Sequence, residues 1–128
     1  MIHAADIPAD VRARLAGYRT ITTLPVQWGD QDPFGHVNNV THIRWFESGR
    51  VAYLEQLGMR YMVSPEGKGL ILAAVRCNYL RQINFPDSVR IGSRVTRIGN
   101  SSLIMAHAVY SQQQQALVGH GADGLGPR

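Results

Sequence analysis

Residues 28–39 read WGDQDPFGHVNN, and they lead directly into a segment with a helical spacing of apolar residues. Asp32 stands before a proline, which pushes its backbone away from the helical region. Gly35 is free to adopt a positive φ that other residues resist. Asn38 or Asn39 is a suitable cap for the helix that follows. The stretch therefore predicts a tightly turned loop that brings a carboxylate back toward the start of a helix.

The segment from Asn39 to Leu57 has the pattern of a long amphipathic helix. Its apolar residues recur at spacings of three and four, which is typical of a helix packed on one side. They are Val40, Ile43, Phe46, Tyr53, Leu54 and Leu57. Gly58 follows as a stop signal. At about 1.5 Å per residue such a helix is roughly as long as a small domain is wide, so we expect it at the centre of the fold.

Five stretches are predicted as β-strands from their β-branched and aromatic residues. They are 18–28, 70–85, 88–99, 102–112 and a shorter one within 115–121. Turn signals separate the second, third and fourth, so these three are expected to form an antiparallel meander. Alternation along 88–99 gives two faces. The face expected toward the helix carries Val89, Ile91 and Val95, and the other carries Arg90 and Arg94.

A long helix and an antiparallel sheet of about five strands indicate an α+β fold in which the sheet wraps around the helix. With 128 residues the chain has the size of one domain with one core, so we assign 1–128 to a single domain. Residues 1–17 are interpreted as an N-terminal extension. Residues 116–128 are rich in glycine, and we expect a shortened last strand and a flexible tail there.

Composition narrows the class of protein. Hydrophobic residues make up 45% and charged residues 17%, without an apolar run of membrane-spanning length, so neither disorder nor a membrane span is predicted. The N-terminus lacks a secretory pattern, and we expect a cytoplasmic location. The net charge of +4 comes from dispersed arginines, which suits a small phosphate-bearing ligand better than nucleic acid. The single cysteine, Cys77, is expected to be an ordinary buried thiol.

The spacing of Asp32 and Asn39 suggests a reaction class. The folded-back loop can place the carboxylate opposite the first-turn N–H groups of the helix, which have no intrahelical partner and can bind an oxyanion. A carboxylate and such an amide on opposite sides of one carbonyl carbon form an acyl-transfer site. An amide leaving group needs a strong general acid, whereas a thiolate leaves readily because the pKa of its thiol is about 8.5. The pattern therefore favours a thioesterase over a peptidase.

The run WGDQDPFGHVNNVTHIRWFESGRVAYLEQLG at 28–58 resembles the hot-dog-fold thioesterases of the 4-hydroxybenzoyl-CoA thioesterase type, in which an aspartate precedes Gly-His-Val-Asn-Asn at the start of the central helix. The resemblance covers about residues 18–115. It implies an acyl-CoA thioesterase with Asp32 as nucleophile or general base and the backbone N–H of Asn39 polarising the thioester carbonyl. Residues of the same loop are expected to shape it or to line the substrate; they are Gly35, His36 and Asn38.

The resemblance also implies partners. The substrate is expected to be a thioester of coenzyme A or of acyl-carrier protein, with no cofactor beyond the coenzyme A that the substrate carries. Family members form homodimers, often paired into tetramers, with active sites at the subunit boundary, which covers an exposed sheet edge. Arg90 and Arg94 are candidates for binding the phosphates of coenzyme A, or they form a solvated face. Family members usually have a fuller last strand than we expect after residue 115.

Other interpretations stay open. Asp30 fits a structural acceptor in the loop better than a second catalytic acid. A metal site would have to use Asp30, Asp32, His36 and His42, which lack a metal-ligand spacing, so no metal is predicted. The main alternative function is a non-catalytic module that binds acyl-CoA or acyl-carrier protein on the same fold. A structural interaction protein and a hot-dog dehydratase are the other two.

Overall fold

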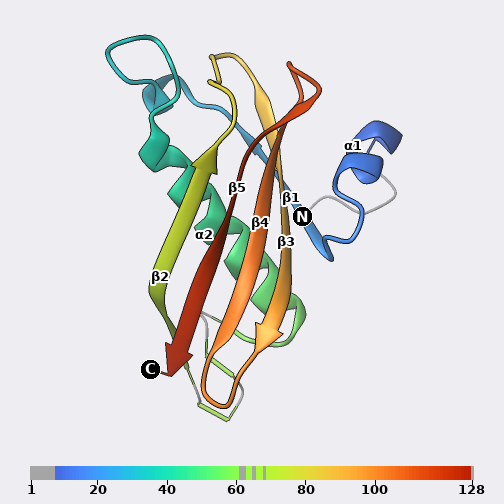
Figure 1. The fold of residues 1–128 in the computed structure, drawn as a ribbon, viewed down its shortest axis with the longest axis vertical. Coiled ribbons are helices and arrows are strands. Elements are labelled where there is room, and N and C mark those ends of the chain that lie inside the picture. Colours follow the sequence, from blue (N-terminus) through green and yellow to red (C-terminus); the bar gives the residue numbers. More distant parts are fainter. Residues whose placement is uncertain (1–7, 61–62, 65, 68, 128) are drawn as a thin grey trace.

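The computed structural model describes residues 8–60, 63–64, 66–67 and 69–127, in two helices, a short 3₁₀ turn and five strands (Figure 1). In chain order the elements are α1 (Ala9–Arg14), β1 (Thr20–Pro25), η2 (Trp28–Asp30), α2 (Asn39–Gln56), β2 (Leu70–Tyr79), β3 (Ser88–Ile98), β4 (Leu103–Ser111) and β5 (Ala116–Pro127). The predicted central helix agrees with α2 to within one residue. Gly58 has a φ of 84° and its N–H bonds to the carbonyl of Glu55, so it ends the helix as expected.

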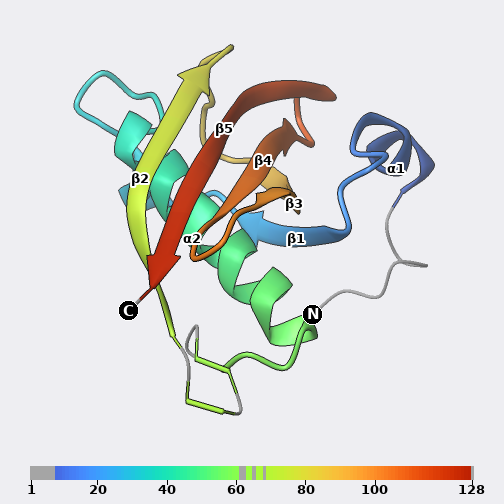
Figure 2. The same cartoon turned by 60° about the horizontal axis from the view of Figure 1, so that its bottom comes forward.

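The strands form one antiparallel sheet in the order β1-β3-β4-β5-β2. The sheet curves around α2, which lies in its hollow (Figure 2). One long helix held by a curved five-stranded antiparallel sheet is the hot-dog architecture, so the predicted α+β class is confirmed. No helix in the described part of the chain is both long enough and apolar enough to cross a membrane.

The predicted meander of 70–85, 88–99 and 102–112 is wrong in one respect. Strands β3, β4 and β5 do follow one another as hairpins, but β2 does not pair with β3. It lies at the far edge of the sheet and pairs with β5 along most of its length. The turn residues at 86–87 signal that the chain reverses, and they carry no information about which distant strand the preceding segment will join.

The expected flexible tail is also wrong, because residues 116–127 form the longest strand of the sheet. β5 is paired on both sides, with β4 and with β2. Its glycines do not make it disordered; they allow neighbouring parts of the chain to pack closely against the strand. A Cβ added at Gly121 would clash with the carbonyl oxygen of Arg76 and lie 2.6 Å from the Phe46 ring. At position 121 the strand packs so closely against α2 and β2 that only glycine leaves enough room.

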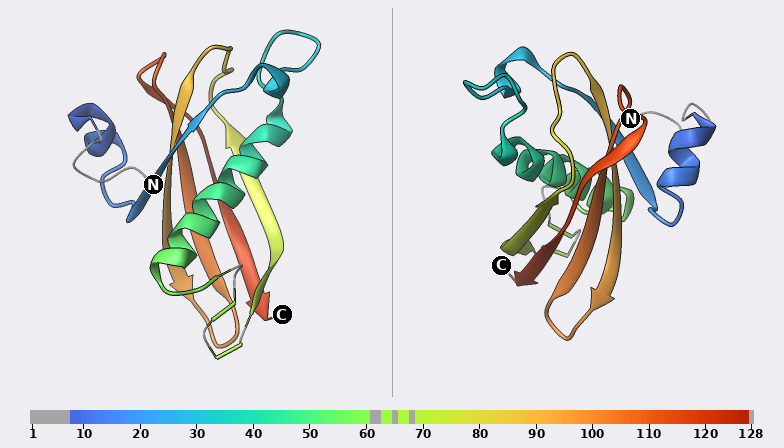
Figure 3. Two further views of the ribbon diagram at one scale, coloured as in Figure 1. Left: turned by 180° about the vertical axis from the view of Figure 1, so that it is seen from behind. Right: turned by 45° about the horizontal axis from the view of Figure 1, so that its top comes forward.

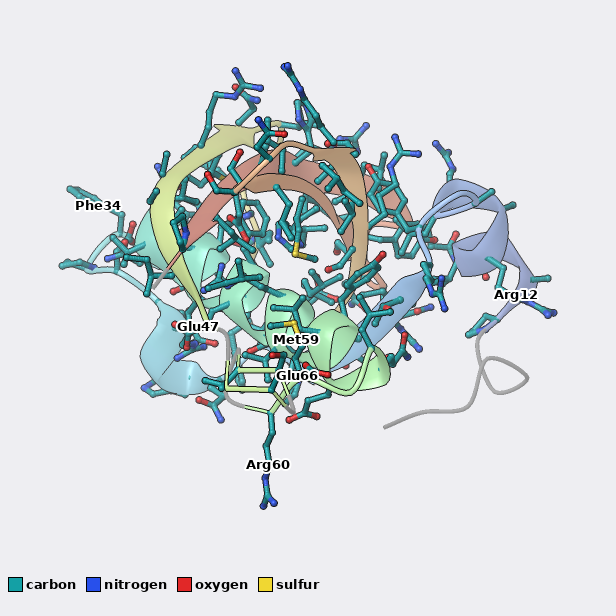
Figure 4. All side chains as sticks on the ribbon, turned by 90° about the horizontal axis from the view of Figure 1, so that it is seen from below. Arg12, Phe34, Glu47, Met59, Arg60 and Glu66 are labelled. Atoms are coloured by element: carbon teal, nitrogen blue, oxygen red, sulfur yellow. The ribbon has the colours of Figure 1, made fainter. Side chains whose placement is uncertain are left out.

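The main core lies between α2 and the concave face of the sheet. Trp45 and Phe46 of the helix pack against Val89, Ile91 and other apolar side chains from β3, β4 and β5. The prediction for β3 is confirmed, since Val89 and Ile91 are fully buried on the helix side. Figure 4 shows the side chains filling the space between the curved sheet and the helix.

A second layer lies on the opposite face of the sheet. The short helix α1, in the segment interpreted as an extension, packs Val11 and Leu15 against Ala108 and Tyr110 of β4. The hydroxyl of Tyr110 donates a hydrogen bond of 2.7 Å to the Asp10 carboxylate. Figure 3 shows α1 and α2 on opposite sides of the sheet.

Candidate active site

The loop between η2 and α2 turns tightly around Asp32. Gly35 has a φ of +83°, as its position in the sequence predicted, and its N–H bonds to the Asp32 carbonyl. The Asp32 Oδ1 accepts hydrogen bonds from the backbone N–H groups of Phe34 (2.9 Å) and His36 (3.2 Å). No described residue bonds to the other carboxylate oxygen, Oδ2. The loop therefore fixes the orientation of the carboxylate through one oxygen and leaves the second available.

Asn38 caps α2. Its side-chain Oδ1 accepts a hydrogen bond of 3.0 Å from the N–H of Val40, and its own N–H bonds to the Asp30 carbonyl. The next residue, Asn39, is the first of the helix, and within the described residues its backbone N–H has no partner. This N–H lies at the positive end of the helix dipole. It is suited to bind a carbonyl oxygen that gains negative charge during a reaction.

Asp30 holds the start of the same loop through both of its carboxylate oxygens. One carboxylate oxygen accepts a hydrogen bond from the Gln27 N–H at 2.8 Å, and the other accepts one from the Arg44 guanidinium at 2.8 Å. Asp30 is buried, whereas the Arg44 side chain is half exposed. The predicted structural role of Asp30 is confirmed: it joins the 3₁₀ turn to α2 and has no free oxygen for chemistry.

A pocket of about 670 Å³ opens beside this loop. It is lined by residues of the loop 32–38, by Asn39 and His42 of α2, by Tyr79 at the end of β2 and by residues 80–83 that follow β2. Asp32, His36, Asn38 and Asn39, all predicted site residues, therefore share one cavity. The pocket combines a carboxylate, a free helix N-terminus and an apolar wall, which is the set of groups that an acyl-transfer site requires.

His36 links the two walls of the pocket. Its Nδ1 lies 3.0 Å from the side-chain oxygen of Asn84, which stands in the connection between β2 and β3. The loop is held further by a hydrogen bond from the Val37 N–H to the Ile83 carbonyl. His36 therefore shapes the loop and lines the pocket at once, and the two roles that were expected for it do not exclude each other.

Sequence reasoning considered His42 only as a metal ligand and did not predict it as a pocket residue, yet it is 3% exposed and lines the same pocket. Its ring contacts the rings of Trp45 (centroids 5.1 Å apart) and Tyr79 (5.0 Å). Burial lowers the pKa of His42 to about 4, so the imidazole is neutral at physiological pH. The one signal in the sequence was its position three residues after Asn39, which places both residues on the same face of the helix.

Arg90 and Arg94 are not brought to the pocket. The Arg90 guanidinium donates a hydrogen bond of 3.0 Å to the Thr23 hydroxyl, and Arg94 lies over the Tyr18 ring at 5.0 Å. Both follow the outward side of β3, on the face that α1 covers. Phosphate recognition by these two arginines stays a prediction, and neither side chain lines the pocket that contains Asp32.

A second cluster of polar residues lies entirely inside the core. Arg50 of α2 and His107 of β4 both contact Asp123 Oδ2 at 2.7 Å, and the Ser93 hydroxyl lies 2.8 Å from the other nitrogen of His107. Ser93, His107 and Asp123 are fully buried. A Ser-His-Asp arrangement without access to substrate is structural, and here it ties α2 to β3, β4 and β5. No local pattern predicts this cluster, because its four residues are far apart in the chain.

No three or more histidine, cysteine or acidic side chains come together as a metal site within the residues that the structure describes. Cys77 is a free thiol, half-buried in β2. Burial raises the pKa of this thiol, which makes it a poor nucleophile at neutral pH.

Comparisons with known proteins agree with this geometry. Among curated proteins, the uncharacterized protein YsmA of Bacillus subtilis is 35% identical over 82 residues, which are 64% of this chain and 54% of that protein; the chain thus spans about half the length of this relative. A thioesterase superfamily protein from Jannaschia sp. superimposes with a TM-score of 0.82 at 25% identity, over 94% of this chain and 78% of the other.

A thioesterase from Thermus thermophilus, solved in complex with coenzyme A and zinc, has a TM-score of 0.73 at 31% identity and covers 86% of this chain and 84% of its own. Residues 26–123 match the family described as the thioesterase-like superfamily, a stretch that includes the loop, α2, strands β2 to β4 and the first part of β5. The chain therefore belongs to the thioesterase-like superfamily.

Proposed function

We propose that this protein is an acyl-CoA thioesterase in which Asp32 and the N-terminus of α2 act on opposite sides of one thioester carbonyl. The observation that carries the proposal is that Asp32 keeps one oxygen free in the same pocket as the unpartnered N–H of Asn39. In this arrangement the carbonyl oxygen accepts the Asn39 N–H, which polarises the C=O bond. The carboxylate then acts on the carbonyl carbon from the other side.

Two routes lead to the same products. Asp32 attacks the carbonyl carbon and expels the thiolate of coenzyme A, and water then hydrolyses the mixed anhydride to restore the carboxylate. In the second route Asp32 removes a proton from a water molecule that attacks instead. Either route consumes one thioester and one water and yields an acid and coenzyme A. No cofactor is needed, since coenzyme A enters only with the substrate.

The test is a thiol-release assay with a panel of acyl-CoA esters. Asp32→Asn should lower kcat by at least about 100-fold, because it removes the nucleophile or base. Glu55→Gln, which makes the same change near the far end of α2, should leave kcat unchanged. Equal rates for Asp32→Asn and the parent protein would contradict the proposal. After a single turnover in ¹⁸O-labelled water, label in Asp32 would establish the anhydride route, because the label enters Asp32 only when water attacks the Asp32 carboxyl carbon of the anhydride.

The main alternative is a module that binds acyl-CoA or acyl-carrier protein without turnover. The free oxygen of Asp32 favours the enzyme, since a binding site for an uncharged thioester has no use for an unpaired carboxylate in its wall. Isothermal titration with a saturated acyl-CoA ester distinguishes the two. Heat of binding with no release of thiol would support the module.

We also propose that the protein works as a homo-oligomer with the pocket near a subunit boundary. β2 is an edge strand with exposed apolar side chains, and further ones surround the pocket. On β2 they are Ile71, Leu72 and Val75, and around the pocket they are Phe34, Val40 and Leu80. Phe34 is 84% exposed, and Figure 4 shows it pointing away from the body of the molecule. Light scattering should give at least a dimer, and Ile71→Lys/Val75→Lys should weaken it.

A further inference from the structure

His42 is the feature of the pocket that the proposed mechanism leaves unused. The side chain is almost fully buried, and no described residue forms a hydrogen bond to either of its ring nitrogens. Buried polar side chains are nearly always paired, so an unpaired one calls for an explanation. An apolar ring of the same size would pack equally well between Trp45 and Tyr79 without that cost.

The orientation of the ring separates its two nitrogens. Nδ1 is sealed from solvent and faces β5, where a Cβ added at Gly119 would lie 2.9 Å from it. Only glycine at this position of the strand leaves room for the ring. Nε2 is not among the buried atoms without a partner, and His42 lines the pocket, so Nε2 is the nitrogen that remains accessible from the cavity.

The position of His42 on α2 brings it near the reacting group. Side chains of a helix lean toward its N-terminus, so a side chain covers the turn that precedes it. His42 follows Asn39 by three residues, and its ring therefore lies beside the first turn, where the Asn39 N–H is free. Tyr79 strengthens this arrangement: its ring contacts His42 and its hydroxyl donates a hydrogen bond of 2.9 Å to the Asn39 carbonyl.

We propose that His42 is a further catalytic residue, whose Nε2–H donates a second hydrogen bond to the thioester carbonyl oxygen beside the Asn39 N–H. This role rests on the proposed thioesterase function. As the carboxylate or water adds to the carbonyl carbon, charge collects on the oxygen and both hydrogen bonds strengthen. When the C–S bond breaks, the charge returns to the carbonyl and the thiolate takes its proton from solvent. His42 keeps its proton throughout.

The protonation state supports a donor rather than an acid. Because burial holds the pKa of His42 near 4, the ring is neutral at the pH of the reaction and carries a single N–H. A buried N–H without an acceptor is rarer in proteins than a buried acceptor without a donor. The tautomer with hydrogen on Nε2 therefore suits the structure, because it leaves a lone pair against Gly119 and directs the N–H to the pocket.

The experiment compares His42→Phe with His42→Gln in the full chain, with the thiol-release assay and thermal unfolding as readouts. Phe keeps the ring and removes the donor, so kcat should fall about 100-fold while KM changes little. The Tm should stay equal or rise, because no hydrogen bond within the protein is lost. Gln offers a side-chain N–H at a similar reach and should retain more kcat than Phe. If His42 had only a structural role, His42→Phe would instead show a lower Tm and little loss of kcat.

A spectroscopic measurement stands beside the kinetics and does not depend on how the variants fold. With ¹⁵N-labelled histidine, the Nε2–H resonance of His42 should shift when the parent protein binds 2-oxoheptyl-CoA, a ketone that presents a carbonyl but cannot be hydrolysed. An unshifted Nε2 resonance in the bound protein, or a His42→Phe variant with the kcat of the parent, would overturn the role of His42 and leave Asp32 unaffected. Absence of turnover by the parent protein on every ester of the panel would instead contradict the thioesterase proposal, and the role of His42 with it.

Discussion

The guanidinium of Arg50 lies 2.7 Å from the carboxylate of Asp123, and both side chains are buried between α2 and β5. The two residues are 73 positions apart, so the contact is a tie between the central helix and the last strand. His107 adds a second contact of 2.7 Å to the same carboxylate oxygen. Burial raises the pKa of Asp123, but the hydrogen bonds and charges of His107 and Arg50 outweigh that effect and leave it below the usual value.

Removing one member of this tie should strongly destabilise the fold. We expect Arg50→Met to lower the free energy of unfolding by about 3–5 kcal/mol, because Asp123 is left as a buried charge with one partner fewer. Urea denaturation followed by circular dichroism measures the effect. Arg44→Met, which breaks a half-exposed pair with Asp30, is the control and should cost less. A loss below that of the control would contradict a buried tie.

The stability should depend on pH through His42. In the unfolded chain a histidine binds a proton below a pH of about 6.5, whereas the folded His42 stays neutral down to about 4. The unfolded state therefore binds more protons in this window, and the free energy of unfolding should fall by about 3 kcal/mol as the pH drops from 6.5 to 4. The stability curve of His42→Phe against pH should lack this part of the fall. A further loss is expected below pH 3.8 as Asp123 becomes protonated.

Gly121→Ala should destabilise the protein, although alanine is normally tolerated better than glycine in a strand. The added Cβ would meet the backbone carbonyl oxygen of Arg76 on one side and the packed ring of Phe46 on the other. Neither group can move away easily. We expect a loss of about 3 kcal/mol in urea denaturation. Gly126→Ala in the same strand has open space and should change stability little. Similar losses for both variants would show that β5 is not packed this closely.

Asn38→Ala should weaken both the helix and the reaction. The variant loses the side-chain bond to the Val40 N–H, which should cost about 1 kcal/mol of stability. It should also lower kcat, since a frayed first turn no longer holds the Asn39 N–H in place. Asn38→Asp preserves the cap and suits the helix dipole, so its stability should be at least that of the parent. Thermal unfolding and thiol release on the same preparations test both effects.

Several features of the site could be predicted because their causes are local. The positive φ of Gly35, the cap by Asn38 and the stop at Gly58 each follow from a residue and its immediate neighbours. The same holds for the two faces of β3, which need only the alternation of a strand. Asp32 and Asn39 are seven residues apart in the sequence, and the tight loop between them brings both to the same pocket.

Other features could not be predicted, because they depend on contacts between distant parts of the chain. The glycines after residue 118 suggested a loose tail, and they are the reason that β5 fits between β2 and α2. The turn at 86–87 was correctly placed, but it could not show that β2 would pair with β5. Arg90 and Arg94 were correctly placed on the outward face, and only the folded chain shows that α1 covers that face.

The sequence by itself determined the loop, the helix and the carboxylate, since turn, cap and stop signals act over a few neighbouring residues. The tertiary structure alone decided which side chains are enclosed. Nothing local distinguishes His42 from other helix residues, and its burial comes from packing against Gly119 of β5. Nothing local distinguishes Asp123 within its strand either, and its pairing comes from contact with Arg50 of α2. Burial and pairing are properties of the packed chain, and they shift the pKa values of these two residues from their usual range.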